Sequence, residues 1–352
     1  MTHPVPIDAD FDRAFGASPT RWAIAGPGRI ATTLVSEFVL VPEAKLVAVG
    51  SRSAQRAESF AKEHGIGRAH GSYAALLADP NVDVVYIATT TQQHHAIALE
   101  AVRAGKAVLV EKAFTATLAA AVEIVAEARA RNVFAMEAMW TRFHPAVIRA
   151  RELLAEGAIG EIFAVQADLG VACDYDPLDR LFAAELGGGA LLDLGVYVVS
   201  FAQMLLGAPQ TVRAVGALES NGVEGCATLL LGWPNGCSAT LTTSLHSPMP
   251  GAARVFGSRG WLEFPPYFHQ PKGFVLYRAG HEPEPVLMPP LGFGYAHELI
   301  EVTRCVRAGT KESSVMPLDD TLAVMAVLEE AAAQLGVTRR EDADVLGPDR
   351  KG

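Results

Sequence analysis

Residues 22–31, with the sequence WAIAGPGRIA, decide the fold of this 352-residue chain. An apolar run ends at Gly26 and a helical pattern begins at Ile30, which places the motif Gly-x-Gly-x-x-Ala between a strand and a helix. The first glycine permits a tight turn, the second lets a ligand approach the backbone, and Ala31 lets the helix pack closely. Because helix starts attract phosphate, the stretch predicts a dinucleotide-binding turn. The residues expected to contact the dinucleotide here are Gly26, Gly28, Arg29 and Ile30.

Short apolar runs alternate with helical patterns downstream of this turn, as far as residue 138. The predicted strands are 22–26, 44–50, 82–89, 107–112 and 133–138, and the predicted helices are 30–38, 54–64, 94–104 and 118–131. Strands that alternate with helices run parallel and are joined by right-handed crossovers. The first part of the chain is therefore expected to be an α/β domain with a doubly wound parallel sheet of the Rossmann type.

The pattern changes beyond Pro145. The elements predicted there are a helix at 146–156, a strand around 162–168, a helix at 189–206, successive antiparallel strands within 211–264, and helices at 295–307 and 318–335. This order is typical of an α+β domain with an open-faced, mostly antiparallel sheet. We expect a flexible N-terminal arm (1–20), a Rossmann domain (21–140) and a domain for substrate binding and oligomerisation (141–352). The last helix is a candidate for packing back on the first domain.

The composition is that of a globular protein, with 50% hydrophobic and 19% charged residues. The net charge of −10 disfavours nucleic acids and anionic membranes as partners, because both attract positive surfaces. The four cysteines lie far apart without a Cys-x-x-Cys pair, so no metal site is expected. Neither a secretory signal nor an uncharged apolar stretch of membrane-spanning length is predicted, and we expect a cytoplasmic protein.

The residues after the second predicted strand bear on the choice between NAD and NADP. An NAD site places Asp or Glu about 20 residues beyond the glycine turn, where it binds the ribose hydroxyls. This chain has VGSRS at 49–53, without an acid. Arg52 and Arg56, one helical turn apart, can pair with a 2′-phosphate, and Ser51 can donate a hydrogen bond to it. We therefore expect NADP, with NAD as the alternative, whereas ordinary surface arginines would be a purely structural explanation.

Two further clusters suggest chemistry. Lys112 ends a predicted strand, and the carboxyl ends of parallel strands line the ligand crevice. Asp193 and Tyr197 follow a glycine run and lie four residues apart, so they share one helix face. These three residues are the candidate catalytic groups, although a helix cap and a half-buried tyrosine would also explain the second cluster. The further candidates for cofactor contact are Thr89, His94, Glu111 and Lys112.

Together these features resemble the glucose–fructose oxidoreductase/inositol dehydrogenase/MocA (Gfo/Idh/MocA) family, and most of all its dihydrodiol dehydrogenase and D-xylose 1-dehydrogenase branch. The resemblance covers nearly the whole chain after residue 20 and is carried by MEAMWTRFHPA (136–146), GGGALLDLGVY (187–197) and KESSVMPL (311–318). The family's Glu-Lys-Pro motif appears as EKA at 111–113, and Tyr197 stands where much of the family has histidine.

The resemblance implies that Tyr197 is the acid/base, with Lys112 lowering its pKa. It also implies that Arg52 and Arg56 bind NADP and that Trp140 lies near the substrate, with Arg142 close by. Phe293 and the loop 171–184 are expected to shape the pocket, and Asp193 to bind a substrate hydroxyl or orient Lys112. The substrate-binding candidates are therefore Trp140, Arg142, Asp193 and Phe293.

The leading hypothesis is an NADP-dependent oxidoreductase that transfers a hydride between a hydroxyl of a sugar or cyclic diol and nicotinamide. The residues allow carbonyl reduction equally well. The alternatives are a non-catalytic NADP-binding sensor or regulator on the same fold, and a sugar reductase with tightly bound cofactor. Apolar residues at alternate positions of the strands in 211–264 predict a sheet with an uncovered apolar face, and hence a homodimer through that face.

Overall fold

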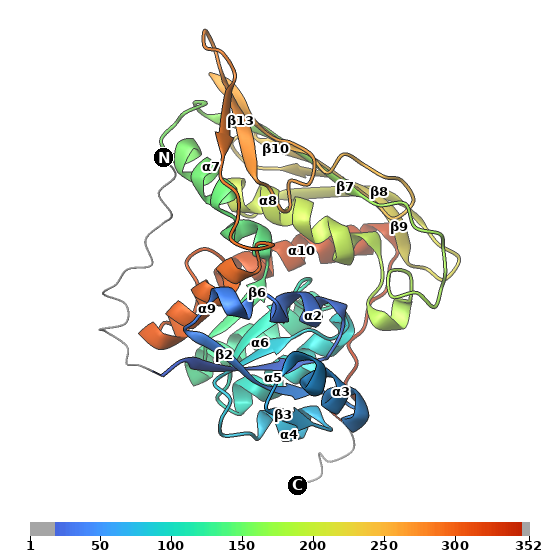
Figure 1. Cartoon of the computed structure of the whole chain (residues 1–352). Helices are drawn as coiled ribbons and strands as arrows, with labels where there is room; N and C mark the ends of the chain where they lie inside the picture. The colour runs from blue at the N-terminus through green and yellow to red at the C-terminus, as the bar shows by residue number, and fades with distance from the viewer. Residues whose placement is uncertain (1–17, 347–352) are drawn as a thin grey trace.

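Six parallel strands form the first sheet in a computed structural model that describes residues 18–346. Their spatial order is β3-β2-β1-β4-β5-β6, and the chain crosses over between β3 and β4 (Figure 1). The strands are β1 (Thr20–Ala25), β2 (Ala44–Gly50), β3 (Arg68–His70), β4 (Val84–Ile87), β5 (Ala107–Glu111) and β6 (Ala135–Ala138). The strand order reverses between β1 and β4, and ligands bind at such a switch point. The predicted doubly wound α/β fold is confirmed, while residues 1–17 of the predicted arm lie outside the described part.

The connecting helices begin and end at side chains suited to these positions. They are α2 (Arg29–Val35), α3 (Ala54–His64), α4 (Tyr73–Leu77), α5 (His94–Arg103) and α6 (Leu118–Arg131). The hydroxyls of Ser53 and Thr117 cap the starts of α3 and α6 by accepting backbone N–H groups at 3.3 Å. Gly65 and Asn132 end the same two helices in the left-handed conformation. Local sequence therefore sets these helix boundaries.

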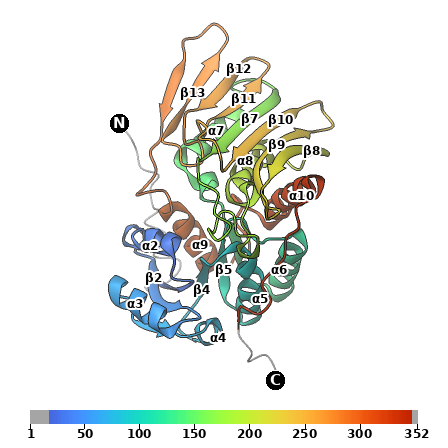
Figure 2. The ribbon, with the colours of Figure 1, turned by 90° about the vertical axis from the view of Figure 1, so that its right-hand side faces the viewer.

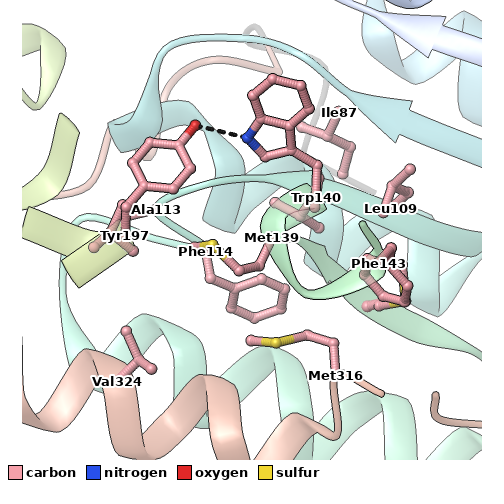
Figure 3. Close-up of a cluster of buried hydrophobic side chains, with 14 of the residues drawn as sticks. Ile87, Leu109, Ala113, Phe114, Met139, Trp140, Phe143, Tyr197, Met316 and Val324 are labelled. Atoms are coloured by element: carbon pink, nitrogen blue, oxygen red, sulfur yellow. Dashed lines mark hydrogen bonds between the residues drawn. The ribbon is translucent and has the colours of Figure 1, made fainter. Parts of the chain in front are cut away.

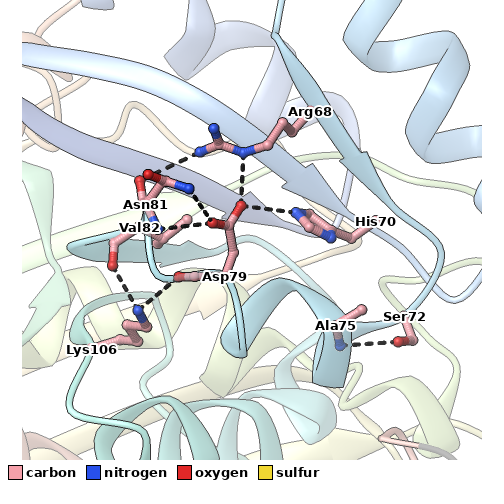
Figure 4. A network of polar contacts seen from close by, with 8 residues as sticks. All are labelled: Arg68, His70, Ser72, Ala75, Asp79, Asn81, Val82 and Lys106. Atoms are coloured by element: carbon pink, nitrogen blue, oxygen red, sulfur yellow. Dashed lines mark hydrogen bonds and ion pairs between the residues drawn. The ribbon is translucent and has the colours of Figure 1, made fainter.

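A network around Asp79 stabilises the end of the sheet away from the glycine turn (Figure 4). The Asp79 carboxylate accepts from Arg68 Nε at 2.7 Å and from Asn81 N at 2.8 Å, and it lies 3.2 Å from His70 Nε2. Burial opposes ionisation, but the hydrogen bonds and the Arg68 charge lower the pKa of Asp79 to about 2. Lys106 Nζ donates to the Asp79 carbonyl at 2.8 Å, so the loops before β4 and β5 are joined.

The second sheet has eight strands in the order β14-β13-β12-β11-β7-β10-β9-β8 (Figure 2). They are β7 (Ile162–Gly170), β8 (Thr211–Leu218), β9 (Glu224–Gly232), β10 (Ser238–Ser244), β11 (Ala253–Gly257), β12 (Gly260–Phe264), β13 (Gly273–Arg278) and β14 (Glu284–Leu287). The predicted open, mostly antiparallel sheet is confirmed. The expectation that consecutive strands are all antiparallel neighbours needs one correction, because β10 pairs with β7 in parallel.

Three helices accompany this sheet, α7 (Pro145–Ala155), α8 (Val196–Leu206) and α10 (Leu318–Leu335), whereas α9 (Ala296–Ala308) packs on β2 of the first sheet. α8 packs on β7 and β10, and α10 packs on β8, α8 and also α6 of the first domain (Figure 1). The continuous helical stretch Ala184–Leu206 is long and apolar enough to cross a membrane, contrary to the expectation that no stretch is. However, 78% of its apolar window is buried inside the protein, as in a core helix. The helix is apolar all round because the sheet covers one side and α10 the other.

The segment after α10 runs back across both domains. Arg339 forms a buried ion pair with Glu224, at the start of β9, at 2.9 Å. The Glu341 carboxylate accepts from the Thr117 backbone N–H at 2.8 Å, at the start of α6. Asp342 N donates to the carbonyl of Gln92 at 2.7 Å. This C-terminal tail, residues 337–346, thus links the second sheet to the loops of the Rossmann domain.

Candidate active site

The glycine turn lies at the carboxyl end of the parallel sheet, against the end of β4. Gly26 has a φ of +100°, and a Cβ atom there would lie 2.8 Å from Thr89 Cγ2, so only glycine fits. A Cβ on Gly28 would meet no atom of the described chain closer than 3.9 Å, so packing does not require glycine at this position. Arg29 and Ile30 open α2, whose start has no side-chain cap. The turn therefore leaves space and unpaired N–H groups that fit a phosphate.

Two exposed arginines lie beside this turn, at the start of α3. Arg56 Nη2 donates to the carbonyl of Pro27 at 3.3 Å, so its guanidinium reaches back to the glycine turn. Burial raises the pKa of Tyr73, while the charges of Arg52 and Arg56 both oppose that rise, which places the two cations near one phenol. Ser51 is buried and its hydroxyl accepts from the backbone N–H of Ser53 at 3.2 Å. The positive charge predicted after β2 is thus concentrated in one place.

Thr89 and His94 differ in what they offer a cofactor. The Thr89 hydroxyl is buried at the end of β4 and has no hydrogen-bond partner within residues 18–346. The methyl group of Thr89 lies against the glycine turn, and its orphaned hydroxyl fits a dinucleotide bound nearby. His94 is 1% exposed, and its ring nitrogens lie 3.1 Å from the Ala113 carbonyl and 3.2 Å from the Thr89 carbonyl. Burial lowers the pKa of His94 to about 4. Its ring thus contacts two backbone segments beside Lys112 rather than open space.

Lys112, Asp193 and Tyr197 come together, although 81 residues separate the first two. Lys112 Nζ donates to the Asp193 carbonyl at 2.8 Å and lies 3.4 Å from Asp193 Oδ1. The same ammonium group lies 4.8 Å from the centroid of the Tyr197 ring. Asp193 belongs to a single π-helical turn, η5 (Leu191–Gly195), which runs directly into α8 and Tyr197. The wider turn presents both side chains toward Lys112.

The Tyr197 hydroxyl accepts a hydrogen bond from Trp140 Nε1 at 3.1 Å, as Figure 3 shows. Trp140 is itself buried and stacks on Tyr295, with ring centroids 4.2 Å apart. The prediction that Lys112 lowers the pKa of Tyr197 is wrong for the net effect. Burial raises that pKa well above 10, the charges of Glu111 and Asp193 add to the rise, and the Trp140 hydrogen bond offsets part of it. Tyr197 is therefore a protonated phenol at neutral pH.

Glu111 and Arg142 do not face the space between the glycine turn and Lys112. The Glu111 carboxylate accepts from the Tyr86 hydroxyl and from the Lys112 backbone N–H at 3.2 Å, and burial raises its pKa. Arg142 is 1% exposed, and its guanidinium donates to Ser200 and Gln203 on α8 and to Asp320 on α10. All three guanidinium nitrogens of Arg142 are already bonded inside the protein, and its predicted substrate contact stays a prediction.

Phe293 stands on the loop before α9 and is 67% exposed. Its backbone N–H donates to Glu37 Oε1 at 3.0 Å, and the same carboxylate accepts from Ala296 N at 3.0 Å. Glu37 is 2% exposed, so the loop is anchored although the Phe293 ring is free to meet solvent. The Phe293 ring is thus exposed on an anchored loop, and its predicted contact with the substrate pocket stays a prediction.

Three residues near the catalytic cluster had no signal in the sequence. Arg180, on the loop 171–184, donates from Nη1 to Asp193 Oδ1 at 3.0 Å. The His269 ring lies 5.3 Å from the Tyr197 ring, and burial with the Lys112 charge lowers its pKa to about 4. Tyr295 stacks on Trp140. None of these residues belongs to a local motif, so only the folded arrangement identifies them.

Electrostatics separate the acids of the cluster. Burial raises the pKa of Glu298, and the nearby charge of Glu111 adds to this rise. For Asp193 burial also opposes ionisation, but the charges of Lys112 and Arg180 lower its pKa to about 2. Asp193 is therefore the ionised acid of the catalytic cluster at neutral pH. Within residues 18–346 no three His, Cys, Asp or Glu side chains are grouped so as to hold a metal ion.

An N-terminal dinucleotide turn, and a cluster in which Lys112 of the same domain meets Asp193 and Tyr197 of a second domain with an open-faced sheet, define a two-domain dehydrogenase. Comparisons with known proteins agree. Residues 20–139 match the family model described as an oxidoreductase family with an NAD-binding Rossmann fold, and residues 147–263 match that of the GFO/IDH/MocA C-terminal domain. Mouse trans-1,2-dihydrobenzene-1,2-diol dehydrogenase is 38% identical over 330 residues, which cover 92% of this chain and 98% of the relative.

Solved structures show the same architecture. A 3-ketoreductase from Actinomadura kijaniata, crystallised with NADP and TDP-benzene, is 27% identical with a TM-score of 0.79 and covers 92% of this chain and 99% of its own. An aldose-aldose oxidoreductase from Caulobacter crescentus, crystallised with glycerol, is 26% identical with a TM-score of 0.83, over 90% of this chain and 98% of its own. The chain belongs to the NAD(P)-binding Gfo/Idh/MocA family of oxidoreductases.

Proposed function

We propose that this oxidoreductase transfers a hydride between NADP and a hydroxyl-bearing carbon of a sugar or cyclic diol, with Tyr197 as the acid/base. The observation that carries the proposal is the convergence of three groups. Lys112 Nζ lies 4.8 Å from the centroid of the Tyr197 ring and binds Asp193, at the carboxyl end of the sheet that carries the glycine turn. Relatives named as a diol dehydrogenase, an aldose-aldose oxidoreductase and a 3-ketoreductase support this substrate class.

The residues around the glycine turn fit a dinucleotide. Gly28 leaves the space for a pyrophosphate, the start of α2 supplies N–H groups, and the orphaned Thr89 hydroxyl is a ready partner. Arg52 and Arg56 would hold the 2′-phosphate, since no acid after β2 is present to bind ribose hydroxyls. Once bound, the nicotinamide ring supplies the hydride acceptor or donor for the reaction.

Tyr197 holds the proton that the substrate oxygen gains or loses. Burial and the acids Glu111 and Asp193 keep the phenol protonated, which suits proton donation to a carbonyl oxygen during reduction. In the oxidative direction the phenolate oxygen must accept the substrate proton. The Trp140 hydrogen bond and the Lys112 ammonium stabilise this phenolate, and so oppose the effect of Glu111 and Asp193. The residues therefore serve both directions, with the reductive one starting from the resting protonation state.

Replacing Tyr197 by phenylalanine tests this role. The Tyr197→Phe variant is expected to lose about 100-fold or more in kcat, as for removal of a positioned general acid, while its affinity for NADP stays unchanged. Reduced-cofactor absorbance measures turnover with a panel of aldoses and cyclic diols, and cofactor fluorescence measures binding. Tyr277→Phe, on β13, is the matched control. Wild-type silence across the panel with intact NADP binding would instead favour the sensor hypothesis, and retained activity in Tyr197→Phe contradicts the assigned role.

The NADP preference is tested through Arg52. Loss of a charge-assisted hydrogen bond of about 1.5–3 kcal/mol predicts a rise of about 10- to 100-fold in KM for NADP in Arg52→Ala. KM for NAD, which lacks the phosphate, should not rise. A parallel rise for both cofactors would show that Arg52 maintains the loop rather than reads the phosphate. Cofactor that survives gel filtration of the purified protein would favour a reductase with tightly bound cofactor.

We also propose a homodimer through the outer face of the eight-stranded sheet. Large apolar side chains point outward there: Val215 is 70% exposed, Leu230 53% and Trp261 40%. A second copy would bury these three side chains around a twofold axis. The four cysteines form no disulfides, which supports a reducing compartment such as the cytoplasm.

A further inference from the structure

The loop 171–184 brings a second cation to the catalytic cluster. Arg180 Nη1 and Lys112 Nζ share one carboxylate oxygen, Asp193 Oδ1, at 3.0 and 3.4 Å. The Arg180 side chain is 47% exposed and that of Asp193 19%, so both remain accessible from solvent. Among the residues that the structure describes, no hydrogen bond reaches Asp193 Oδ2 or the Nε and Nη2 atoms of Arg180. The pair thus offers a ligand one free acceptor, Asp193 Oδ2, beside the free N–H donors of Arg180.

The position of Arg180 is fixed by its neighbours. Leu181 N donates to Asp179 Oδ1 at 2.8 Å, and the Leu181 carbonyl accepts from Gly189 N at 2.8 Å, in the glycine run before η5. Phe182 is fully buried, and its carbonyl accepts from Asn221 Nδ2 at 2.7 Å. These contacts fix the backbone on the C-terminal side of Arg180, and the bond to Asp193 Oδ1 orients its guanidinium. Preorganised donors bind a ligand more strongly than mobile ones, because less entropy is lost on binding.

We propose that Arg180 and Asp193 together read a vicinal diol, so that the enzyme selects substrates with a hydroxyl next to the reacting carbon. The hydroxyl next to the reacting carbon donates to Asp193 Oδ2 and accepts from the free nitrogens of Arg180, while the reacting hydroxyl exchanges its proton with Tyr197. This inference rests on the proposed function, because it assigns substrate recognition at the same site. Arg180 touches substrate in this arrangement but takes no part in proton or hydride transfer, which are left to Tyr197 and the cofactor.

The charge arrangement favours this neutral ligand over an anionic one. Lys112 and Arg180 are positive, Asp193 is ionised, and His269 is neutral above its pKa of about 4. An anion bound by Arg180 would face the Asp193 carboxylate only one hydrogen bond away, and like charges at such a distance repel. A hydroxyl can instead donate to the acid and accept from the guanidinium at once.

The test compares trans-cyclohexane-1,2-diol with cyclohexanol in the wild type and in Arg180→Met. The variant is expected to lose about 10- to 100-fold in kcat/KM for the diol, as for loss of one charged hydrogen bond, and to stay within about threefold for cyclohexanol. If cyclohexanol turns over too slowly to measure, its inhibition constant against the diol replaces kcat/KM. Arg149→Met, which removes an exposed arginine paired with Glu152 on α7, is the matched control. The affinity for NADP should not change in either variant.

Three outcomes contradict the inference. An equal loss for both substrates means that Arg180 only holds Asp193 in place. No loss for either substrate means that the pair is a surface contact. A loss confined to a carboxylated sugar such as glucuronate, with the diol unaffected, means that Arg180 reads an anion. If the wild type oxidises neither substrate and no sugar of the panel, the proposed function fails first, and this result is distinct from the other three.

Discussion

Arg142 offers the sharpest contrast between a functional and a structural role. Its guanidinium lies between α8 and α10 and is almost fully buried. Nε donates to Ser200 Oγ at 3.0 Å, Nη2 donates to the Ser200 carbonyl at 3.2 Å and to Gln203, and Nη1 pairs with Asp320. We expect the substitution Arg142→Met to destabilise the protein and leave substrate binding unchanged, because every donor of this side chain serves the seam between the two helices.

The magnitude follows from the groups left behind. Gln203 is 5% exposed, so its carbonyl oxygen loses a partner without gaining water, and the Ser200 groups are buried as well. Asp320 retains about a third of its surface and can be hydrated. Loss of a hydrogen bond to a charged donor costs about 1.5–3 kcal/mol, so the two buried partners Ser200 and Gln203 together lose about 3–6 kcal/mol. With an unfolding entropy of about 2.1 cal/mol/K per residue over 352 residues, this corresponds to a fall in Tm of about 4–8 °C.

Differential scanning calorimetry measures the Tm, and steady-state kinetics with the best diol of the panel measures KM at a temperature well below it. Arg149→Met, on the exposed face of α7, should shift Tm by less than about 1 °C, since surface pairs contribute little. An unchanged Tm together with a raised KM in Arg142→Met would refute this reasoning and restore the substrate-binding role that the sequence suggested.

Three further perturbations test other parts of the structure. Burial raises the pKa of Glu137 to about 7, so the folded state retains a proton that the unfolded state releases above pH 4.5. The free energy of unfolding should therefore fall by about 3 kcal/mol as pH rises from 4.5 to 8. Denaturant titrations of Glu137→Gln should show a smaller fall. The same dependence on pH in the variant would exclude Glu137 as the cause. Arg339→Ala leaves the Glu224 carboxylate buried and unpaired, so chemical denaturation should show that the free energy of unfolding falls by about 3–5 kcal/mol. A fall below about 1 kcal/mol, as for a surface pair, would contradict burial of the pair. Leu230→Asp should yield a monomer in equilibrium sedimentation if the wild type is a dimer through the outer sheet face, and a persistent dimer would place the interface elsewhere.

Elements with a strong local signal could be predicted from the sequence. The bounds of α3, α6 and β2 match the prediction residue for residue, because Ser53 and Thr117 cap the helix starts and Gly65 and Asn132 end them. The short elements β3 and α4 were missed, since three and five residues carry no periodicity that separates them from a loop. β13 and β14 were also missed, at an edge where the pattern of burial is irregular.

The site was predicted where the chemistry is carried by residues in motifs, and not where it depends on packing. The convergence of Lys112 with Asp193 and Tyr197 was expected from strand-end and helix-face reasoning. Arg180 lies 13 residues before Asp193 in an irregular loop, so no periodicity connects the two. The direction of the Tyr197 pKa was mistaken for a similar reason. Sequence identifies the nearby lysine, but the buried acid Glu111, which adds to the effect of burial, becomes a neighbour of the phenol only in the folded protein.

The C-terminal tail connects the turn that carries Asp193 to the Rossmann domain. Glu224 accepts from Leu191 N at 3.1 Å, at the first residue of the π-helical turn that carries Asp193, and Arg339 of the tail neutralises the same carboxylate. A few residues on, Asp342 binds the Gln92–Gln93 backbone and side chain, directly after Thr89 and the end of β4. Within four residues the tail therefore pairs with Glu224, which binds the start of η5, and with the Gln92–Gln93 segment of the Rossmann domain. Because four residues span at most about 14 Å, this connection limits how far the turn that carries Asp193 can move from the end of β4.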